Sequence, residues 1–121
     1  MATLLVNSGK AVVTNRIQGS GTAPQYVAWG TGTGTTSATD TTLFTETGTR
    51  TSGTTTQQTT STTNDTYQVV GTMTAGGTLA ITNAGLFDAS TVGNLFVKGD
   101  FSTINLNSGD SIQFTFRTQF S

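Results

Sequence analysis

The alternating pattern of residues 111–120 constrains the fold more than any other feature of the sequence. Apolar side chains occupy every second position there, namely Ile112, Phe114, Phe116 and, after a break, Phe120. Because successive side chains of a β-strand point to opposite faces, this alternation predicts a strand with one apolar face. Three phenylalanines on that face need a hydrophobic core, so a second layer of structure must cover them.

Shorter segments upstream carry the same kind of signal. Residues 67–73 alternate in the same way, residues 25–29 form a compact apolar run, and residues 78–82 and 94–101 also favour strands. Gly, Asn or Ser flank these segments, and Ala75-Gly76-Gly77 predicts a hairpin turn. Several short strands with such spacing predict an antiparallel β-sandwich or a jelly-roll-like barrel.

One segment favours a helix instead. Asn7 and Ser8 are suitable N-cap residues for a helix over residues 9–18, and Gly19 can end it. The sequence thus predicts a mainly β protein with one short N-terminal helix. A chain of 121 residues is the usual size of one domain, so we expect a single β-sandwich domain over residues 1–121.

The composition predicts a polar but uncharged exterior. Threonine is the most frequent residue, while only 33% of residues are hydrophobic and 9% are charged. Threonine is β-branched and suits a pleated strand, and its hydroxyl tolerates water. Low hydrophobicity alone would favour disorder, but disordered chains also carry high net charge, and here the net charge is −1.

The polar stretch over residues 45–64 contains almost no apolar residue. It predicts either a long hairpin of exposed strands that turns near Ser52 and Gly53, or an arm that orders against a partner chain. Just before it, Leu43 and Phe44 are expected to hold the Gly-Thr-rich loop that begins at residue 30 against the core.

The sequence argues against an enzyme, because it contains neither His nor Cys and no convergent set of catalytic groups. Its acidic residues stand beside turn formers, and the glycines of residues 30–34 lack the Lys of a phosphate loop. No catalytic, cofactor-binding or metal-binding residue is predicted.

The basic residues are scattered, which argues against nucleic-acid binding. No apolar run spans a membrane, and the opening residues do not resemble a signal peptide, so synthesis in the cytoplasm is expected.

Five residues are candidate subunit contacts. Charges are few, so Arg50 and Arg117 stand out as side chains that can pair with carboxylates of a neighbouring subunit. The alternating Thr47, Thr49 and Thr51 can pack against a second chain without desolvating ions. The alternative is that all five lie on solvated strands, where surface ion pairs contribute little.

Three stretches together resemble a known group of proteins. They are residues 27–36, with Trp29 followed by the Gly-Thr repeat, residues 40–50, which end at Arg50, and residues 81–88. This order resembles small structural proteins of bacteriophage virions, among them capsid decoration (cement) proteins and the N-terminal modules of tail-collar fibres. The likeness covers most of the chain, and its motifs are structural.

The resemblance implies a decoration protein on the outer capsid surface that binds the major capsid protein and ties capsomers together. It also implies a homo-oligomer, with three copies as the expected number. One alternative is a tail or collar component that attaches a fibre. Another is a carbohydrate-binding module on the particle surface, for which Trp29 and Tyr67 would be the first ligand platforms to test.

Overall fold

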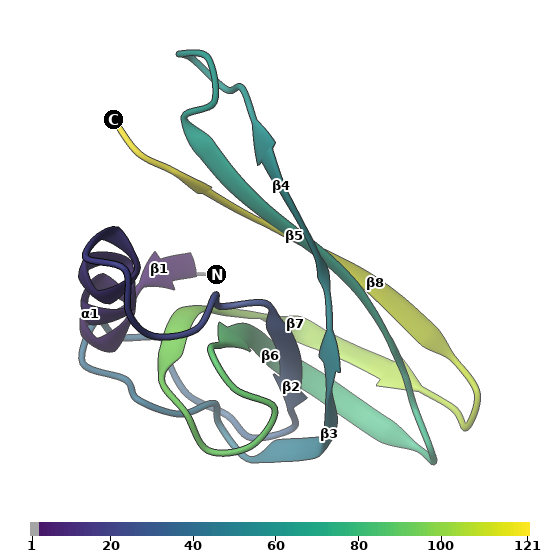
Figure 1. The fold of residues 1–121 in the computed structure, drawn as a ribbon. Coiled ribbons are helices and arrows are strands. Elements are labelled where there is room, and N and C mark those ends of the chain that lie inside the picture. The colour runs from purple at the N-terminus through teal and green to yellow at the C-terminus, as the bar shows by residue number, and fades with distance from the viewer. Residues whose placement is uncertain (1–2) are drawn as a thin grey trace.

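The computed structural model describes residues 3–121, so Met1 and Ala2 of the expected domain lie outside the described residues. The described residues form eight strands and one helix (Figure 1). The elements are β1 (Thr3–Leu5), α1 (Asn7–Ile17), β2 (Tyr26–Gly30), β3 (Glu46–Ser52), β4 (Thr54–Gln58), β5 (Thr66–Thr74), β6 (Leu79–Phe87), β7 (Leu95–Leu106) and β8 (Ser111–Gln119).

The strands form two antiparallel sheets. The large sheet has the order β1-β7-β6-β2-β3, and the small sheet has the order β4-β5-β8. The prediction of a mainly β sandwich with one short helix is therefore confirmed, but the sheets do not close into a barrel.

The chain passes from the large sheet to the small sheet at Gly53. β3 pairs with β2, and β4 continues in nearly the same direction but pairs with β5, so residues 52–53 do not turn a hairpin (Figure 1). The Gly53 amide donates to the Gln25 carbonyl at 2.7 Å, and a Cβ at Gly53 would lie 2.5 Å from Val69 Cγ1. Only glycine allows the backbone to pass this close to the core.

Two further crossings between the sheets lie side by side. Residues 75–78 join β5 to β6, and residues 107–110 join β7 to β8. The Ala75 amide donates to the Asp110 carbonyl, and the Gly109 amide donates to the Ala75 carbonyl, both at 2.8 Å. The turn predicted at Ala75-Gly76-Gly77 exists, but its flanking strands pair in different sheets, so the hairpin interpretation was wrong.

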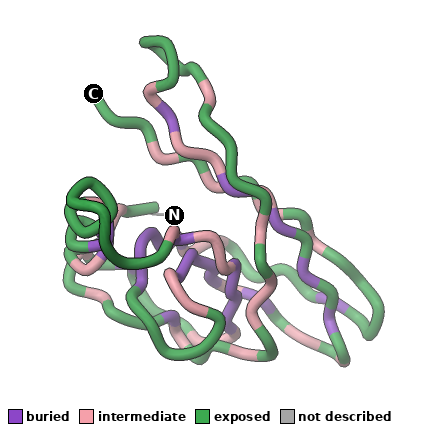
Figure 2. Tube along the Cα trace, viewed as in Figure 1, coloured by how far each residue is buried: buried purple, intermediate pink, exposed green. Residues whose placement is uncertain are grey.

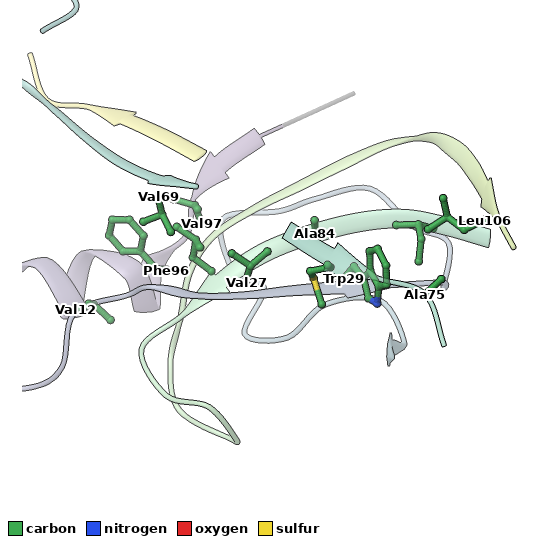
Figure 3. Close-up of a cluster of buried hydrophobic side chains, with 12 residues drawn as sticks. Val12, Val27, Trp29, Val69, Ala75, Ala84, Phe96, Val97 and Leu106 are labelled. Carbon is green, nitrogen blue, oxygen red and sulfur yellow. The ribbon is translucent and has the colours of Figure 1, made fainter. Parts of the chain in front are cut away.

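The main core lies between the two sheets (Figure 3). Val27 and Trp29 from β2 meet Val69 from β5, and all three side chains are at most 2% exposed. Trp29 also makes an edge-to-face contact with Phe114 of β8, with ring centroids 6.3 Å apart. Side chains from both sheets therefore contribute to a single hydrophobic layer, as in a sandwich.

A second apolar cluster lies on the other face of the large sheet. Ala28, Phe87 and Leu95 alternate in sequence with members of the main core, and Leu43 covers them from the loop. Asn83 of β6 fixes the loop with a pair of hydrogen bonds, from the Phe44 amide at 3.0 Å and to the Phe44 carbonyl at 3.1 Å. The predicted anchoring of the loop through Leu43 is confirmed.

The helix forms where the sequence predicted it, but it begins earlier. Its N-cap is Val6, which makes no side-chain cap. The Asn7 amide instead donates to the Ala38 carbonyl at 2.8 Å, and the Ser8 hydroxyl donates to the Leu95 carbonyl at 2.7 Å. The N-cap roles expected for Asn7 and Ser8 were wrong, because both residues lie inside the helix and the Ser8 hydroxyl makes a tertiary contact instead. Gly19 follows the helix with φ of +92°, as a helix-ending glycine does.

The small sheet extends beyond the large one (Figure 2). The strand predicted over residues 111–120 is confirmed as β8, and Phe114 and Phe116 pack against the main core while remaining half-buried. Phe120 is 47% exposed. Phe120 belongs to neither hydrophobic cluster, so the expected inward role of Phe120 was wrong.

Candidate interaction surface

The two sheets are joined along one side and open along the other. β3 runs into β4 at Gly53 on the joined side, whereas β1 and β8 are the outer strands on the opposite side. Within residues 3–121, each of these two strands pairs with one neighbour only, β1 with β7 and β8 with β5. The sandwich therefore has an open seam between β1 and β8.

A groove of about 750 Å³ occupies this seam, and we call it the seam groove. Its walls are Thr3, Leu4, Leu5, Ala84, Val97, Gly99, Phe101, Ile104, Phe114, Thr115, Phe116, Arg117, Thr118 and Gln119. Arg117 is the one charged residue among them. The groove is consequently lined mostly by apolar and uncharged polar residues.

A second groove of about 480 Å³, which we call the helix groove, lies between α1 and the small sheet. Val12, Val13 and Ile17 form one wall, and Tyr67 and Phe120 belong to the other. The Tyr67 hydroxyl donates to the Pro24 carbonyl at 2.9 Å. Burial raises the pKa of Tyr67 to about 12, against a smaller opposing effect of Arg16, so Tyr67 remains a neutral donor near pH 7.

Exposed apolar side chains gather at these two grooves. Of the five large apolar side chains that are exposed among the described residues, Leu4 and Ile104 line the seam groove, and Ile17 and Phe120 line the helix groove. Val92 lies elsewhere, in the turn before β7. Clustering of this kind marks interaction surfaces more reliably than scattered apolar residues do.

Arg50, a predicted subunit contact, is engaged within its own chain. Its guanidinium donates to both carboxylate oxygens of Glu46, at 2.8 and 3.0 Å. It also donates to the carbonyls of Ala89 and Val92, at 2.9 and 2.7 Å, and lies 3.6 Å from the centre of the Phe87 ring. The side chain is only 7% exposed, so it fastens the turn between β6 and β7 to β3.

The three candidate threonines lie on β3, the outer strand of the large sheet opposite β1. Thr49 is exposed, whereas Thr47 and Thr51 are half-buried. The Thr47 hydroxyl donates to the Thr45 carbonyl at 3.0 Å. The three threonines lie along the β3 edge of the large sheet, whereas Arg117 lies on the small sheet.

Arg117 lies on β8, beside the seam groove. Its side chain is exposed, and its Nε donates to the Gln68 side-chain oxygen at 2.7 Å across the β5–β8 pair. The structure therefore separates the five candidates into a β3 group with Arg50 and a single position on β8.

A buried ion pair was missed by the sequence analysis. The Lys98 ammonium is fully buried and lies 2.9 Å from an Asp40 carboxylate oxygen. It also donates to the Thr42 carbonyl at 2.9 Å and lies 3.3 Å from the centre of the Phe44 ring. The Ser37 amide, followed by Lys98, holds the pKa of Asp40 below its ordinary value of 3.8, although partial burial opposes the shift. Fifty-eight positions separate Lys98 from Asp40, so no local pattern could reveal the pair.

The end of the arm formed by β4 and β5 is organised by Asp65. Its carboxylate accepts hydrogen bonds from the amides of Thr60, Ser61 and Thr62, at 2.9 to 3.0 Å. Bonds from the backbone at Thr62 and Thr60 lower the pKa of Asp65 far below 3.8. The polar stretch predicted as a hairpin or arm therefore ends in a loop with its own hydrogen-bond framework.

Two aromatic residues were candidates for sugar binding. Trp29 is 2% exposed and packs in the main core, so its ring offers no platform to a ligand. Tyr67 is half-buried, and its ring contacts Phe96 edge to face at 5.9 Å.

The two grooves are lined mainly by apolar and uncharged polar side chains. Among residues 3–121, no group of three or more His, Cys, Asp or Glu side chains is placed to hold a metal ion. No helix in the same range is long and apolar enough to cross a membrane.

The chain matches no protein-family model, no curated protein and no solved structure. The fold and surface therefore define its class only as a mainly β, sandwich-like protein with an open apolar seam.

Proposed function

We propose that the protein is a structural component of a bacteriophage virion, a decoration protein that binds the outer capsid and strengthens contacts between capsomers. The observation that carries this proposal is the near-neutral apolar seam, set in an exterior of threonine and other uncharged polar residues. Such a surface suits permanent docking, because it can be covered without the desolvation of many ions.

The sequence resemblance supports the same proposal. The three stretches that resemble virion proteins become one unit, because β2 lies between β6 and β3 in the large sheet. Asn83, from the third stretch, holds Phe44, from the second. The resemblance therefore concerns a packed sheet with its covering loop.

In this proposal the protein binds the major capsid protein at the outer surface of the particle. β4 and the loop that follows it project from the sandwich, and most of their residues are exposed (Figures 1 and 2). The polar tip of this arm is a second candidate for contact with the shell.

The number of copies in purified particles tests the proposal. Quantitative mass spectrometry should find hundreds of copies per virion, and particles that lack the protein should release their DNA at a lower temperature. A handful of copies would instead assign the protein to the tail or collar. Its absence from purified particles would refute a virion role altogether.

A further inference from the structure

The free edge of β8 is the longest continuous strand edge that the described chain leaves unpaired. All nine residues of β8 pair with β5 without any register shift. On its other side, β8 has no neighbouring strand within residues 3–121. A strand edge of this kind presents a row of backbone amides and carbonyls that can pair with another chain.

The other outer strands are protected in ways that β8 is not. β1 has three residues and β4 has five. β3 has seven residues, but its register against β2 shifts around Gly48, whose φ is +75°. Short length and bulges are the devices by which monomeric proteins prevent pairing between edges.

β8 has none of these protections. It contains no proline, no lysine and no bulge, and its only charged side chain is Arg117. The apolar side chains Phe114 and Phe116 lie half-buried beside the seam groove, where a neighbouring strand could cover them. The sequence of β8 is therefore that of an interior strand at an edge position.

The residues of β8 are complementary to a second copy of the same strand. Antiparallel pairing about Thr115, its midpoint, would engage all nine residues, whereas a slip that keeps the two faces matched would leave some of them unpaired. In the register centred on Thr115, Phe114 lies opposite the partner's Phe116, and the two-fold symmetry produces this pair twice. Aromatic pairs across strands stabilise sheets, and within the chain Phe114 and Phe116 already stack with centroids 6.0 Å apart.

The polar face fits the same register. Gln113 would lie opposite the partner's Arg117, which repeats the Gln68–Arg117 pair that the chain itself forms between β5 and β8. The two Arg117 side chains would stand four residues apart along the strand, about 14 Å at roughly 3.4 Å per residue. That separation exceeds the Debye length of about 8 Å at physiological salt, so their repulsion is weak.

We propose that two copies of the chain associate through β8, edge to edge and antiparallel, so that their small sheets merge into one sheet of six strands. The partner is a second copy, and the contact has two-fold symmetry centred on Thr115. The association does not depend on a virion role. It departs from the three copies implied by the sequence resemblance, so the mass of the assembly distinguishes the two.

The first test is the mass of the purified protein in solution. Sedimentation velocity over roughly 1 to 100 µM should show a species of about 25 kDa, twice the 12.5 kDa of the chain, that dissociates on dilution. A species that stays at 12.5 kDa throughout, or one of three times that mass, would overturn the proposal.

A substitution at the symmetry centre tests the position of the contact. Thr115 is exposed on the polar face, so Thr115→Lys should leave the monomer folded, which circular dichroism would verify. Two lysines would then stand directly opposite each other, and the dissociation constant should rise at least about fivefold. The matched control is Thr54→Lys, which lies in the same row of the sheet, opposite Val70, but on the outer strand β4.

Mixing variants of opposite charge tests the two-fold symmetry itself. Thr115→Lys and Thr115→Glu should each dimerise more weakly than wild type, and their equimolar mixture should regain the affinity of the wild-type dimer because a lysine then faces a glutamate. A dissociation constant that Thr115→Lys leaves unchanged, or one that Thr54→Lys raises equally, would refute the β8 contact. Failure of the mixture to recover the dimer would refute pairing centred on Thr115.

Discussion

Replacing Asp40 with Asn should destabilise the fold, because it leaves the buried Lys98 ammonium without its counter-charge. Lys98 is fully buried, and the change keeps the shape of the Asp40 side chain and one hydrogen-bond acceptor. The variant therefore tests charge more than packing.

The structure sets the size of the effect. Removing one partner of a fully buried ion pair costs about 3–5 kcal/mol. The Asp40 side chain is 21% exposed, and the Thr42 carbonyl and the Phe44 ring still contact the ammonium, so we expect a smaller loss. A decrease of about 2 kcal/mol in the free energy of unfolding follows, or on the order of 10 °C in Tm for a domain of this size.

Urea unfolding at pH 7 would measure the loss, and two further variants identify its cause. Adding Lys98→Met to Asp40→Asn should recover most of the stability, because a buried apolar side chain needs no counter-charge. Asp110→Asn is the matched control. Asp110 accepts an amide hydrogen bond from Asn107 three residues earlier, as Asp40 does from Ser37, but it has no ion pair with a lysine.

The contribution of Asp40 to the free energy of unfolding should depend on pH with a defined sign. The folded-state pKa of Asp40 lies below its ordinary value of 3.8, so its contribution is fully present above that pH. The contribution is lost as pH falls through the lowered pKa, so wild type and Asp40→Asn should converge in stability at strongly acidic pH. A loss below about 0.5 kcal/mol at pH 7, or no recovery with Lys98→Met, would refute this reasoning.

Two other substitutions test the path of the chain and its arm. Gly53→Ala should cost about 1–3 kcal/mol in urea unfolding because its Cβ would crowd Val69, whereas Gly76→Ala, which meets open space, should change stability by less than about 0.5 kcal/mol. Equal effects would contradict the crossing at Gly53. Asp65→Ala should speed proteolysis of the arm tip at pH 7 with little change in Tm, since three backbone amides lose their acceptor. In wild type the tip should stay protected well below pH 3.8, because the pKa of Asp65 is strongly lowered.

The elements of this fold could be predicted from local patterns, whereas their pairing could not. Alternation identified β5 and β8 because each has one face on the core and one toward solvent. The same alternation cannot tell which strands become neighbours. At Gly53 the deciding contact is with Val69, sixteen residues away. The polar stretch was therefore expected to form either a hairpin or an arm, whereas its first strand continues into the second sheet.

The candidate site residues show a similar limit. Arg50 was predicted to be a subunit contact because charged residues are few. Its hydrogen bonds instead run to Glu46 on β3 and to the turn between β6 and β7, about forty residues away. Its partners in that turn are backbone carbonyls, which leave no mark in the sequence. The seam groove was missed for a comparable reason, since it depends on the relative placement of β1 and β8 at opposite ends of the chain.

The shared path of β3 and β4 has a mechanical consequence. One uninterrupted run of backbone enters the large sheet at Glu46 and leaves the small sheet at Gln58. Tension applied at the tip of the arm therefore travels along the peptide into both sheets, where ladders of hydrogen bonds resist it in shear. Any attachment at that tip would load the whole sandwich, and the arm could not be drawn out without tearing β3 from β2.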